Sequence, residues 1–347
     1  MFRPRPSVDA LSRASSFGLA GAELDLRLTS DGVVVVTHDV VSNRATLEDN
    51  YSGRLNPVDV SLNLQPAVAA ININSRPFSF WNHKTLKVYG GEGHILPSVT
   101  AGAQKMESLD DMLQHYKNLN SAQFSLFLDI QDPVIMTKAA ALVKKYALDD
   151  KVLLKFFAKK AIDSSKYKYN GATTCHQYAV DHGLSGLRIV PQFNDGEMTF
   201  KNNKGYIQVF QTELSVEDYL SCWSAAQTSF GVRSAARLDM VSASVPYGNQ
   251  VAYDTSKAAL DWAKAHGRRT VSIQPNPDAG RKVGNACQFW TFQSNSVKAA
   301  IFDDQARKAK LFFVDAVKPD FVVIDLMGDV QTHTWTDDFP EFTSHFC

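Results

Sequence analysis

The sequence carries no net charge, because 36 lysines and arginines balance 36 aspartates and glutamates. It also has no basic run interleaved with aromatic residues, which is the pattern that binds the phosphates of nucleic acids. We therefore expect no nucleic-acid partner. No segment approaches the roughly 18 uninterrupted apolar residues that a membrane span needs, so no transmembrane segment is expected.

Residues 1–18 contain neither the apolar centre nor the cleavage site of a signal peptide. The sequence thus leaves the compartment open, and a secreted form is expected only if the N-terminus is truncated. Cysteine is scarce, and the four cysteines form no C-x-x-C pair, which argues against a structural zinc site and a dense disulfide framework. Their even number leaves one or two bridges open. The Gly-x-Ser-x-Gly elbow of serine hydrolases is also absent.

Apolar runs typical of buried strands alternate with helical patterns along the chain. The expected strands are 22–28, 125–131, 151–157, 188–193, 240–246, 269–275 and 321–326, and the expected helices are 7–18, 108–119, 133–148 and 254–267. Such alternation implies right-handed crossovers and a parallel sheet, and the number of repeats favours a closed (β/α)8 barrel of the TIM type. Seven barrel strands are recognisable, and an eighth would close the barrel.

The domain organisation predicted is a single barrel domain over residues 1–347. Residues 33–38 are expected to return as the second arm of a hairpin, because Thr-Ser-Asp-Gly supplies a turn after the run at 22–28. The irregular stretch 48–106 is too long for a bare loop, so we expect an insertion or cap there, near a ligand site.

Two acids lie on one face of the first expected strand. Alternation puts Glu23, Asp25 and Arg27 on that face and leucines on the other. Neighbouring carboxylates repel each other unless a cation joins them, and a hard divalent ion is the usual solution; the simpler interpretation is that both acids are solvated at the end of the strand. The hairpin would return His38 beside them, where an imidazole suits acid or base catalysis next to a metal.

The stretch GLAGAELDLRLTSDGVVVVTHDVVSNRAT resembles the signature of the glycerophosphodiester phosphodiesterase family. The family pattern runs Gly-Ala, Glu-x-Asp, Thr-x-Asp-Gly, His-Asp and Arg-x-Thr, in the same order as residues 21–46. Residues 106–116 and 318–330 resemble two further stretches of the family. The resemblance implies a (β/α) barrel that hydrolyses a phosphodiester to an alcohol and a phosphomonoester, with a divalent cation held by carboxylates and two histidines as acid and base.

The resemblance assigns roles to individual residues. It implies that Glu23, Asp25 and Asp129 ligate the cation, either Mg²⁺ or Ca²⁺, and that His38 is one of the two catalytic histidines. Arg27 and Lys155 are the expected substrate-binding residues. The substrate would be a small phosphodiester or a lipid head group.

Two positions and the first strand depart from the family pattern. The family has Glu-x-Lys where this chain has Asp129 and Gln131. Asp still suits a hard cation, but Gln supplies no positive charge for a phosphate, and Lys155 on the next strand is the expected substitute. The family's first strand, which ends in His-Arg-Gly, would fall before Met1, so the barrel would lack its first strand. We expect a longer natural protein rather than a degenerate family member, because closing the barrel removes two exposed edges.

Three functions are compatible with these residues. The first is a metal-dependent glycerophosphodiester or lysophospholipid phosphodiesterase. The second is a sphingomyelinase D-like phospholipase, a related barrel whose third metal ligand is an Asp, as at Asp129. The third is a non-catalytic barrel protein. Since losing one proton-transfer group costs about a hundredfold to ten-thousandfold in rate, we expect the chain as written to be weak or inactive.

Overall fold

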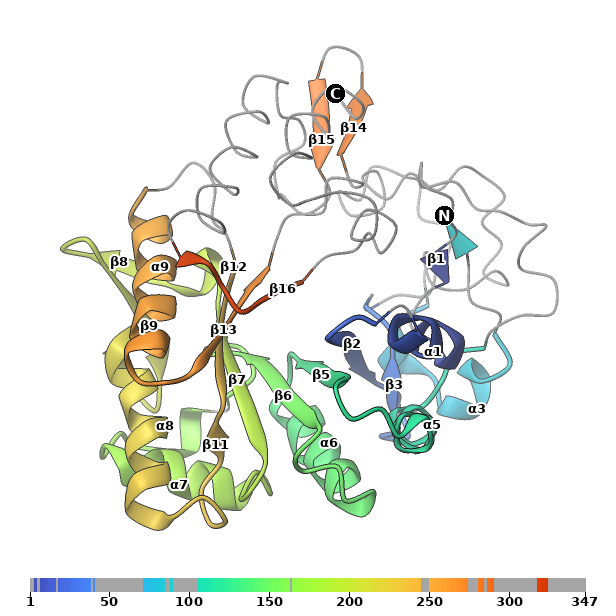
Figure 1. Cartoon of the computed structure of the whole chain (residues 1–347), viewed down its shortest axis with the longest axis horizontal. Helices are drawn as coiled ribbons and strands as arrows, with labels where there is room; N and C mark the ends of the chain where they lie inside the picture. The colour runs from blue at the N-terminus through green and yellow to red at the C-terminus, as the bar shows by residue number, and fades with distance from the viewer. Residues whose placement is uncertain are drawn as a thin grey trace.

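Seven parallel strands form the centre of the computed structural model (Figure 1). The structure describes residues 7–16, 18–38, 40, 71–84, 105–162, 164–244, 250–273 and 317–323, and the backbone of four short strands elsewhere. The strands lie side by side in the order β16-β13-β12-β7-β6-β5-β2. Their bounds are β2 (Gly21–Leu28), β5 (Ser125–Ile130), β6 (Val152–Phe157), β7 (Arg188–Phe193), β12 (Met240–Ser244), β13 (Arg269–Ile273) and β16 (Phe321–Val323).

The predicted strands and their parallel order are confirmed. Within the described residues β2 and β16 do not pair, so this part of the sheet is open between them. The single-domain boundary and a strand before Met1 stay predictions. The two-residue strand β11 (Arg237–Leu238) precedes β12 and pairs with β7. Short antiparallel pairs join β1 (Arg3–Pro4) to β4 (Val88–Tyr89) and β14 (Gly280–Val283) to β15 (Ala286–Phe289).

The predicted hairpin follows β2 directly. Strand β3 (Val34–Val36) pairs antiparallel with the end of β2, with Leu26 opposite Val36. Gly32 has a positive φ of 79° in the connecting turn, a conformation that favours glycine. The Thr37 amide then donates to the Asp25 carbonyl at 2.9 Å. This bond returns the chain to the centre of β2, so that His38 follows beside the acids.

Helices cover the outer face of the sheet. They are α1 (Val8–Ser16), α5 (Leu109–Leu119), α6 (Pro133–Lys145), α7 (Ala172–Asp181), α8 (Val216–Phe230) and α9 (Gln250–Ala265). The short helix α3 (Phe78–Trp81) packs on the hairpin instead. Polar N-caps start several of them: the Ser108 hydroxyl accepts from the Asp111 amide, and Asp132 accepts from the Val134 amide. No helix in the described ranges has the length and apolarity needed to cross a bilayer.

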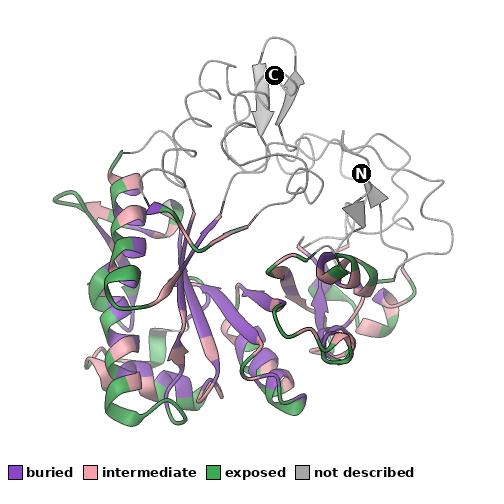
Figure 2. Cartoon of the chain, viewed as in Figure 1, coloured by how far each residue is buried: buried purple, intermediate pink, exposed green. Residues whose placement is uncertain are grey.

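Two apolar layers lie on opposite faces of the sheet. The outer layer packs strand residues such as Leu128 and Ile189 against the helices, which expose their other face (Figure 2). The inner layer fills the barrel interior. It contains Phe127, Leu153, Val190, Met240 and Val271, with Phe321 and Val323 packed against it. Because both strand faces are covered, the strands appear in the sequence as nearly continuous apolar runs.

Part of the stretch expected as an insertion at 48–106 is described, and it packs on the hairpin. Ile73, Trp81 and Met106 form a small cluster with Val35. A 3-10 helix (Ile73–Ser75) precedes α3, and the Asp31 carboxylate accepts from the Phe78 amide at the start of α3. These contacts attach residues 71–84 to the turn of the hairpin. Whether the stretch is a cap stays a prediction, because most of it lies outside the described residues.

A three-stranded antiparallel meander lies between β7 and α8, and the sequence analysis does not predict it. It consists of β8 (Thr199–Lys201), β9 (Lys204–Val209) and β10 (Thr212–Ser215), and a 3-10 helix (Asp195–Glu197) precedes it. A third 3-10 helix spans Ser164–Lys166. Two residues at each turn have positive φ, namely Asn202 and Asn203, then Phe210 and Gln211. Asn often adopts this conformation, but Phe and Gln rarely do, so the second turn has no sequence signal.

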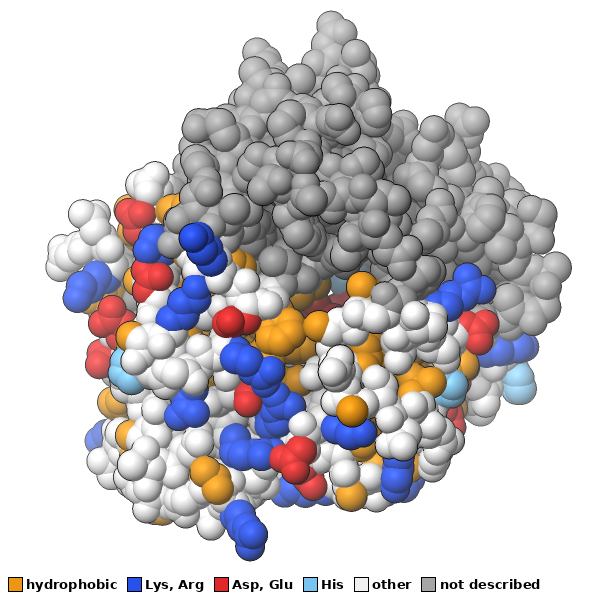
Figure 3. All heavy atoms as spheres, in the orientation of Figure 1, with side chains coloured by type: hydrophobic (Ala, Val, Ile, Leu, Met, Phe, Trp, Pro, Cys, Tyr) orange, Lys and Arg blue, Asp and Glu red, His pale blue; other side chains and the backbone are white. Residues whose placement is uncertain are grey.

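Ion pairs gather at the amino ends of the strands. The Asp239 carboxylate, which precedes β12, accepts from Arg188 at 2.9 Å and from Arg269 at 2.6 Å. Burial alone would raise the pKa of Asp239, but these two guanidinium groups lower it below its usual range. In Figure 3 basic and acidic side chains are interspersed over the described part of the visible face. Opposite charges from successive strands therefore neutralise each other at this end of the barrel.

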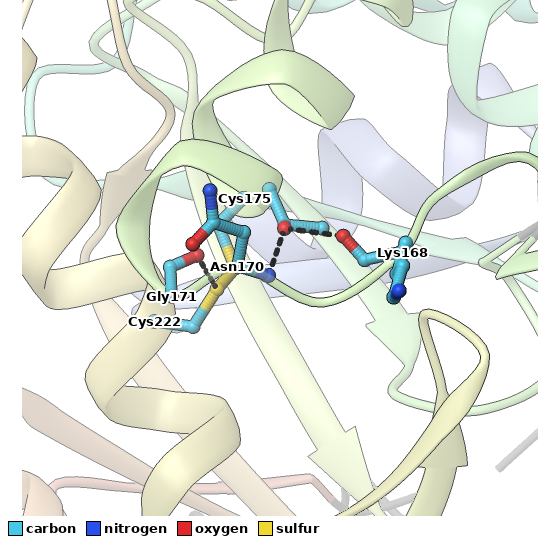
Figure 4. The surroundings of a disulfide bond; sticks show 6 residues. Lys168, Asn170, Gly171, Cys175 and Cys222 are labelled. Atoms are coloured by element: carbon cyan, nitrogen blue, oxygen red, sulfur yellow. Dashed lines mark hydrogen bonds between the residues drawn. A yellow bond between two sulfur atoms is a disulfide. The ribbon is translucent and has the colours of Figure 1, made fainter.

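A disulfide joins the neighbouring helices α7 and α8 (Figure 4). It links Cys175 to Cys222 with a Cα–Cα distance of 5.9 Å and a sequence separation of 47. Both cysteines are buried. Disulfides form and persist mainly in oxidising compartments. Since the sequence left the pairing open, this bond is a finding of the structure.

Removing this disulfide is expected to destabilise the fold. Closing a loop of this length lowers the entropy of the unfolded chain, which in theory stabilises the fold by about 4 kcal/mol. Measured stabilisation by a disulfide is typically about 2–4 kcal/mol. We expect the double substitution Cys175→Ala/Cys222→Ala to lower the urea midpoint accordingly. Adding a reductant to the double variant should change nothing further. A midpoint equal to that of the oxidised wild type would contradict the assignment.

Candidate active site

Three carboxylates from two adjacent strands meet near the carboxyl ends of those strands. The register of β2 and β5 sets Asp25 opposite Asp129, and Glu23 lies two residues before Asp25, on the same face. One carboxylate oxygen from each of Glu23, Asp25 and Asp129 lies within 4.8 Å of the others. The structure therefore brings together the three acids that the sequence singled out.

Lys155 enters the same group from the next strand. The register of β5 and β6 sets it opposite Asp129. Its ammonium nitrogen donates to Glu23 Oε1 and lies 3.6 Å from Asp129 Oδ1. The Lys155 side chain is only 2% exposed, against 20% for Glu23. Lys155 is thus a buried counter-ion of the acidic group, and its predicted role in substrate binding stays a prediction.

Burial and mutual charge shift the pKa values of this group. Burial lowers the pKa of the Lys155 ammonium, but the charges of Asp129 and Glu23 more than offset this and raise it above its usual range. Burial raises the pKa of Asp129 to about 6; Lys155 and His38 oppose the shift, and Asp25 adds to it. Burial also raises the pKa of Asp25, against the charge of His38. One ammonium therefore does not fully stabilise three ionised carboxylates.

His38 lies beside the acids, and Arg27 holds the backbone that carries it. The charge of His38 acts on both Asp25 and Asp129, lowering the pKa of each. The Arg27 guanidinium donates to the main-chain carbonyl of His38 at 2.5 Å. This bond ties the end of the hairpin to β2 at the position from which the imidazole projects. The predicted role of Arg27 in substrate binding stays a prediction.

The acidic group fits a divalent cation by its chemistry. Asp129 Oδ1 is buried and accepts no hydrogen bond from the described residues. The Lys155 ammonium lies 3.6 Å away from it. Such an oxygen is costly to bury without a partner. Carboxylate oxygens from three side chains are the ligands that Mg²⁺ and Ca²⁺ prefer. Glu23, Asp25 and Asp129 could therefore hold such an ion between β2 and β5.

Other histidines of the described chain have different surroundings. His115 bonds to Ser12 at 2.7 Å, and His182 bonds to Thr137 at 2.8 Å. His176 stacks on Phe230 with the ring centroids 3.9 Å apart. None of these three acts on the pKa of Asp25 or Asp129. They serve as packing and hydrogen-bonding side chains.

The position where the family has a lysine contains Gln131 here, and a different lysine contacts it. Lys160 Nζ donates to Gln131 Oε1 at 3.1 Å and lies 5.9 Å from the centroid of the Phe157 ring. Lys160 is exposed at the end of β6, unlike the buried Lys155. Lys155, within β6, thus lies inside the acidic group, and Lys160, just after β6, lies exposed beside Gln131.

Comparison with known proteins agrees with this geometry. Residues 2–179 of the 347 match the model of the Glycerophosphoryl diester phosphodiesterase family. The chain belongs to this family. It is therefore a member of a family of phosphodiester hydrolases, as the signature at residues 21–46 predicted. No curated protein is similar enough in sequence to match.

Solved structures of glycerophosphoryl diester phosphodiesterases resemble the chain over most of its length. A protein of this description from Silicibacter pomeroyi is 13% identical, with a TM-score of 0.50 over 94% of this chain and 86% of that one. Another from Parabacteroides distasonis is 14% identical, with a TM-score of 0.48 over 92% of this chain and 77% of that one. At this identity the first similarity shows the fold alone, and it confirms the predicted α/β barrel of the TIM type.

The family motif does not include two polar side chains inside the barrel. Gln192 on β7 and Ser242 on β12 are buried, and neither is part of the signature. The alternation of side chains along the expected strands 188–193 and 240–246 would have placed both on the inner face, two residues beyond Val190 and Met240.

Replacing Arg27 is expected to loosen the hairpin end that carries His38. In Arg27→Met the His38 carbonyl loses its charged donor, which should cost about 1–2 kcal/mol in the free energy of unfolding. Urea denaturation measures this loss. The matched control is Arg76→Met, because Arg76 is exposed and lies over the Phe80 ring; it should change stability by less than about 0.5 kcal/mol. Equal stability of the two variants would refute the role given to Arg27.

Proposed function

We propose that this chain hydrolyses a glycerophosphodiester or lysophospholipid to an alcohol and a phosphomonoester, with a divalent cation bound by Glu23, Asp25 and Asp129. The observation that carries the proposal is the convergence of these three carboxylates within 4.8 Å. They lie near the carboxyl ends of parallel strands, the end at which barrel enzymes have their active sites. Family membership supports the same reaction class.

The cation, when bound, would withdraw electron density from a phosphoryl oxygen and stabilise the charge that develops on it. Three ionised carboxylates carry three negative charges, and a divalent ion with the Lys155 ammonium would balance them. A phosphodiester with one negative charge would then enter a neutral site. Lys155 therefore has two functions in this proposal: it neutralises Glu23, and it keeps a positive charge near the bound phosphate.

His38 moves a proton in the proposed reaction. Water adds across one P–O bond: its oxygen bonds to phosphorus, and the bond to the leaving alcohol breaks. The His38 imidazole either accepts a proton from the attacking water or donates one to the leaving alcohol oxygen. Arg27 positions the imidazole through the His38 carbonyl. The charge of His38 interacts with those of Asp25 and Asp129, so the three side chains lie close enough to act together.

Turnover is expected to be slow. In the family two histidines share acid and base catalysis, whereas His38 is the one described histidine whose charge acts on Asp25 and Asp129. A single proton-transfer group typically leaves the rate about a hundredfold to ten-thousandfold lower. The assay must therefore detect weak activity.

A sphingomyelinase D-like reaction is the second candidate. The third carboxylate is an Asp on β5, as the resemblance to those enzymes implies. Such an enzyme releases choline from sphingomyelin or lysophosphatidylcholine and forms a cyclic phosphate. The two candidates therefore differ in a product that can be identified.

Cation binding is expected to strengthen as the pH rises through about 6, because the pKa of Asp129 is raised to about 6 and a cation must displace the bound proton. The unfolded chain holds this proton less tightly, with a pKa of about 3.9. In the absence of a cation, Asp129 thus favours folding most below about pH 4, and this contribution is lost as the pH rises through about 6. We expect Ca²⁺ to raise the thermal midpoint more at pH 7.5 than at pH 5 in scanning calorimetry.

Asp129→Asn is the control for this pH dependence. It removes the titrating carboxyl, so stabilisation by Ca²⁺ should become small at both pH values. If Ca²⁺ stabilises the wild type equally at pH 5 and pH 7.5, Asp129 is not a ligand.

Activity is tested with glycerophosphocholine and Mg²⁺ or Ca²⁺, with choline and glycerol phosphate as the measured products. We expect slow hydrolysis that chelation abolishes and that Glu23→Gln and His38→Ala each reduce by about a hundredfold or more. The controls are Glu217→Gln and His83→Ala, because both residues are exposed and lie outside the acidic group; both should match the wild type.

Two outcomes would redirect the proposal. A cyclic phosphate from lysophosphatidylcholine would favour the sphingomyelinase D-like reaction. No product from any of these substrates, with intact Ca²⁺ binding, would favour a non-catalytic barrel.

A further inference from the structure

An exposed lysine lies near the acidic group, just after the carboxyl end of β6. Lys160 Nζ donates to Gln131 Oε1 at 3.1 Å and lies 5.9 Å from the centroid of the Phe157 ring. Gln131 follows the end of β5 directly, two residues beyond Asp129, so it stands nearer the mouth of the barrel than Asp129 does. The bond therefore holds the Lys160 ammonium at the end of the barrel where such enzymes bind their substrates.

The backbone that carries Lys160 is fixed, although its side chain is exposed. The Ala158 amide donates to the Gln192 carbonyl at 2.9 Å, and the Ala161 amide donates to the carbonyl of the last residue of β6 at 3.1 Å. Both alanines are fully buried. Lys159 and Lys160 are therefore two exposed residues on a tight turn whose flanks are buried.

A carboxylate from the loop after β7 holds this turn. Glu197, the last residue of the 3-10 helix before the meander, accepts from the Lys160 amide at 3.1 Å through Oε1. The Lys159 amide donates to the same carboxylate, and both bonds oppose the rise in the pKa of Glu197 that burial causes. Glu197 Oε2 is buried without a hydrogen-bond partner among the described residues. Such a position is costly for a carboxylate, and its bonds to the turn compensate for it.

Two lysines near the acids differ in what they can reach. The Lys155 side chain is 2% exposed, and its ammonium contacts Glu23 and Asp129, so it stays with the acids. Lys160 is exposed. An ammonium has three donors, and the bond to Gln131 uses one of them. The other two are available to phosphate oxygens, and the Gln131 amide nitrogen offers two more donors beside them.

We propose that Lys160 and Gln131 together bind the substrate phosphate at the mouth of the barrel, and that Glu197 positions Lys160 for this contact. This inference rests on the proposed function. Charge-assisted hydrogen bonds from an ammonium to phosphate oxygens are among the strong ones. The charge that contacts the phosphate thus comes from the turn after β6, and the residue that positions it comes from the loop after β7. None of these three residues lies in the signature at 21–46.

The first test measures binding of glycerol phosphate, a phosphomonoester product, by titration calorimetry with Ca²⁺ at pH 7.5. Lys160→Met should weaken binding by about tenfold to a hundredfold, because it removes a charge-assisted hydrogen bond. Lys160→Arg keeps a charged donor and should stay within about threefold of the wild type. Lys159→Met is the matched control, because it removes the same charge from the adjacent exposed residue; it should also stay within about threefold.

A double-mutant cycle separates positioning by Glu197 from a purely structural role. Glu197→Met removes the acceptor that holds the turn. It should weaken glycerol phosphate binding about fivefold or more when Lys160 is present, and change nothing further in Lys160→Met. Glu197→Gln keeps a carbonyl oxygen for the two amides and should bind like the wild type. An equal loss in both backgrounds would overturn the positioning role. If Glu197→Met does not fold, Glu197→Asp takes its place in the cycle, because its shorter side chain withdraws the acceptor.

Activity distinguishes failure of the inference from failure of the proposed function. With glycerophosphocholine, Lys160→Met should raise KM about tenfold and leave kcat within about threefold, because a contact made equally before and during the reaction changes KM alone. Hydrolysis with equal KM in Lys160→Met and Lys159→Met would overturn the inference and leave the function standing. If glycerophosphocholine is not hydrolysed, the proposed function fails and calorimetry decides the inference. Binding that depends on Lys160 but not on Lys159 supports it; equal binding by the two variants, or no binding by the wild type, overturns it.

Discussion

A buried ammonium among three carboxylates is the interaction on which the chemistry of this barrel depends. The Lys155 side chain is 2% exposed and contacts Glu23 and Asp129. Removing one partner of a buried ion pair costs about 3–5 kcal/mol, because the other charge stays buried. Burial raises the pKa of Asp129 to about 6, and the charge of Lys155 does not fully offset this. One lysine balances only part of the negative charge of three carboxylates, which makes the group a suitable site for a divalent cation.

Stability and chemistry are separated along the barrel axis. Apolar side chains such as Phe127 and Val271 fill the interior. At the amino ends of the strands the Asp239 carboxylate pairs with two arginines. Asp25, Asp129 and Lys155 lie one step beyond this apolar layer, nearer the carboxyl ends of the strands. The hairpin then returns His38 beside them, with the Arg27 guanidinium on its carbonyl. The acids and the imidazole are thus held by the strands themselves.

The sequence predicted those features that depend on local pattern. Continuous apolar runs identified the parallel strands, and Thr-Ser-Asp-Gly identified the turn that brings His38 back to Asp25. The pairing of Glu23 and Asp25 with Asp129 came from the family resemblance and agrees with the register of β2 and β5. The contact of Lys155 with Glu23 depends on the registers of three strands, which no local pattern specifies. The Cys175–Cys222 bond and the Phe210–Gln211 turn also depend on tertiary structure.

The most direct test of the account is a crystal structure of the protein grown with Ca²⁺ near pH 7.5, with the ion located by its anomalous scattering. The account predicts one Ca²⁺ bound by an oxygen from each of Glu23, Asp25 and Asp129 at about 2.3–2.6 Å, with the Lys155 ammonium still against the carboxylates. An interior without an ion at saturating Ca²⁺, or an ion that these three side chains do not contact, would contradict it.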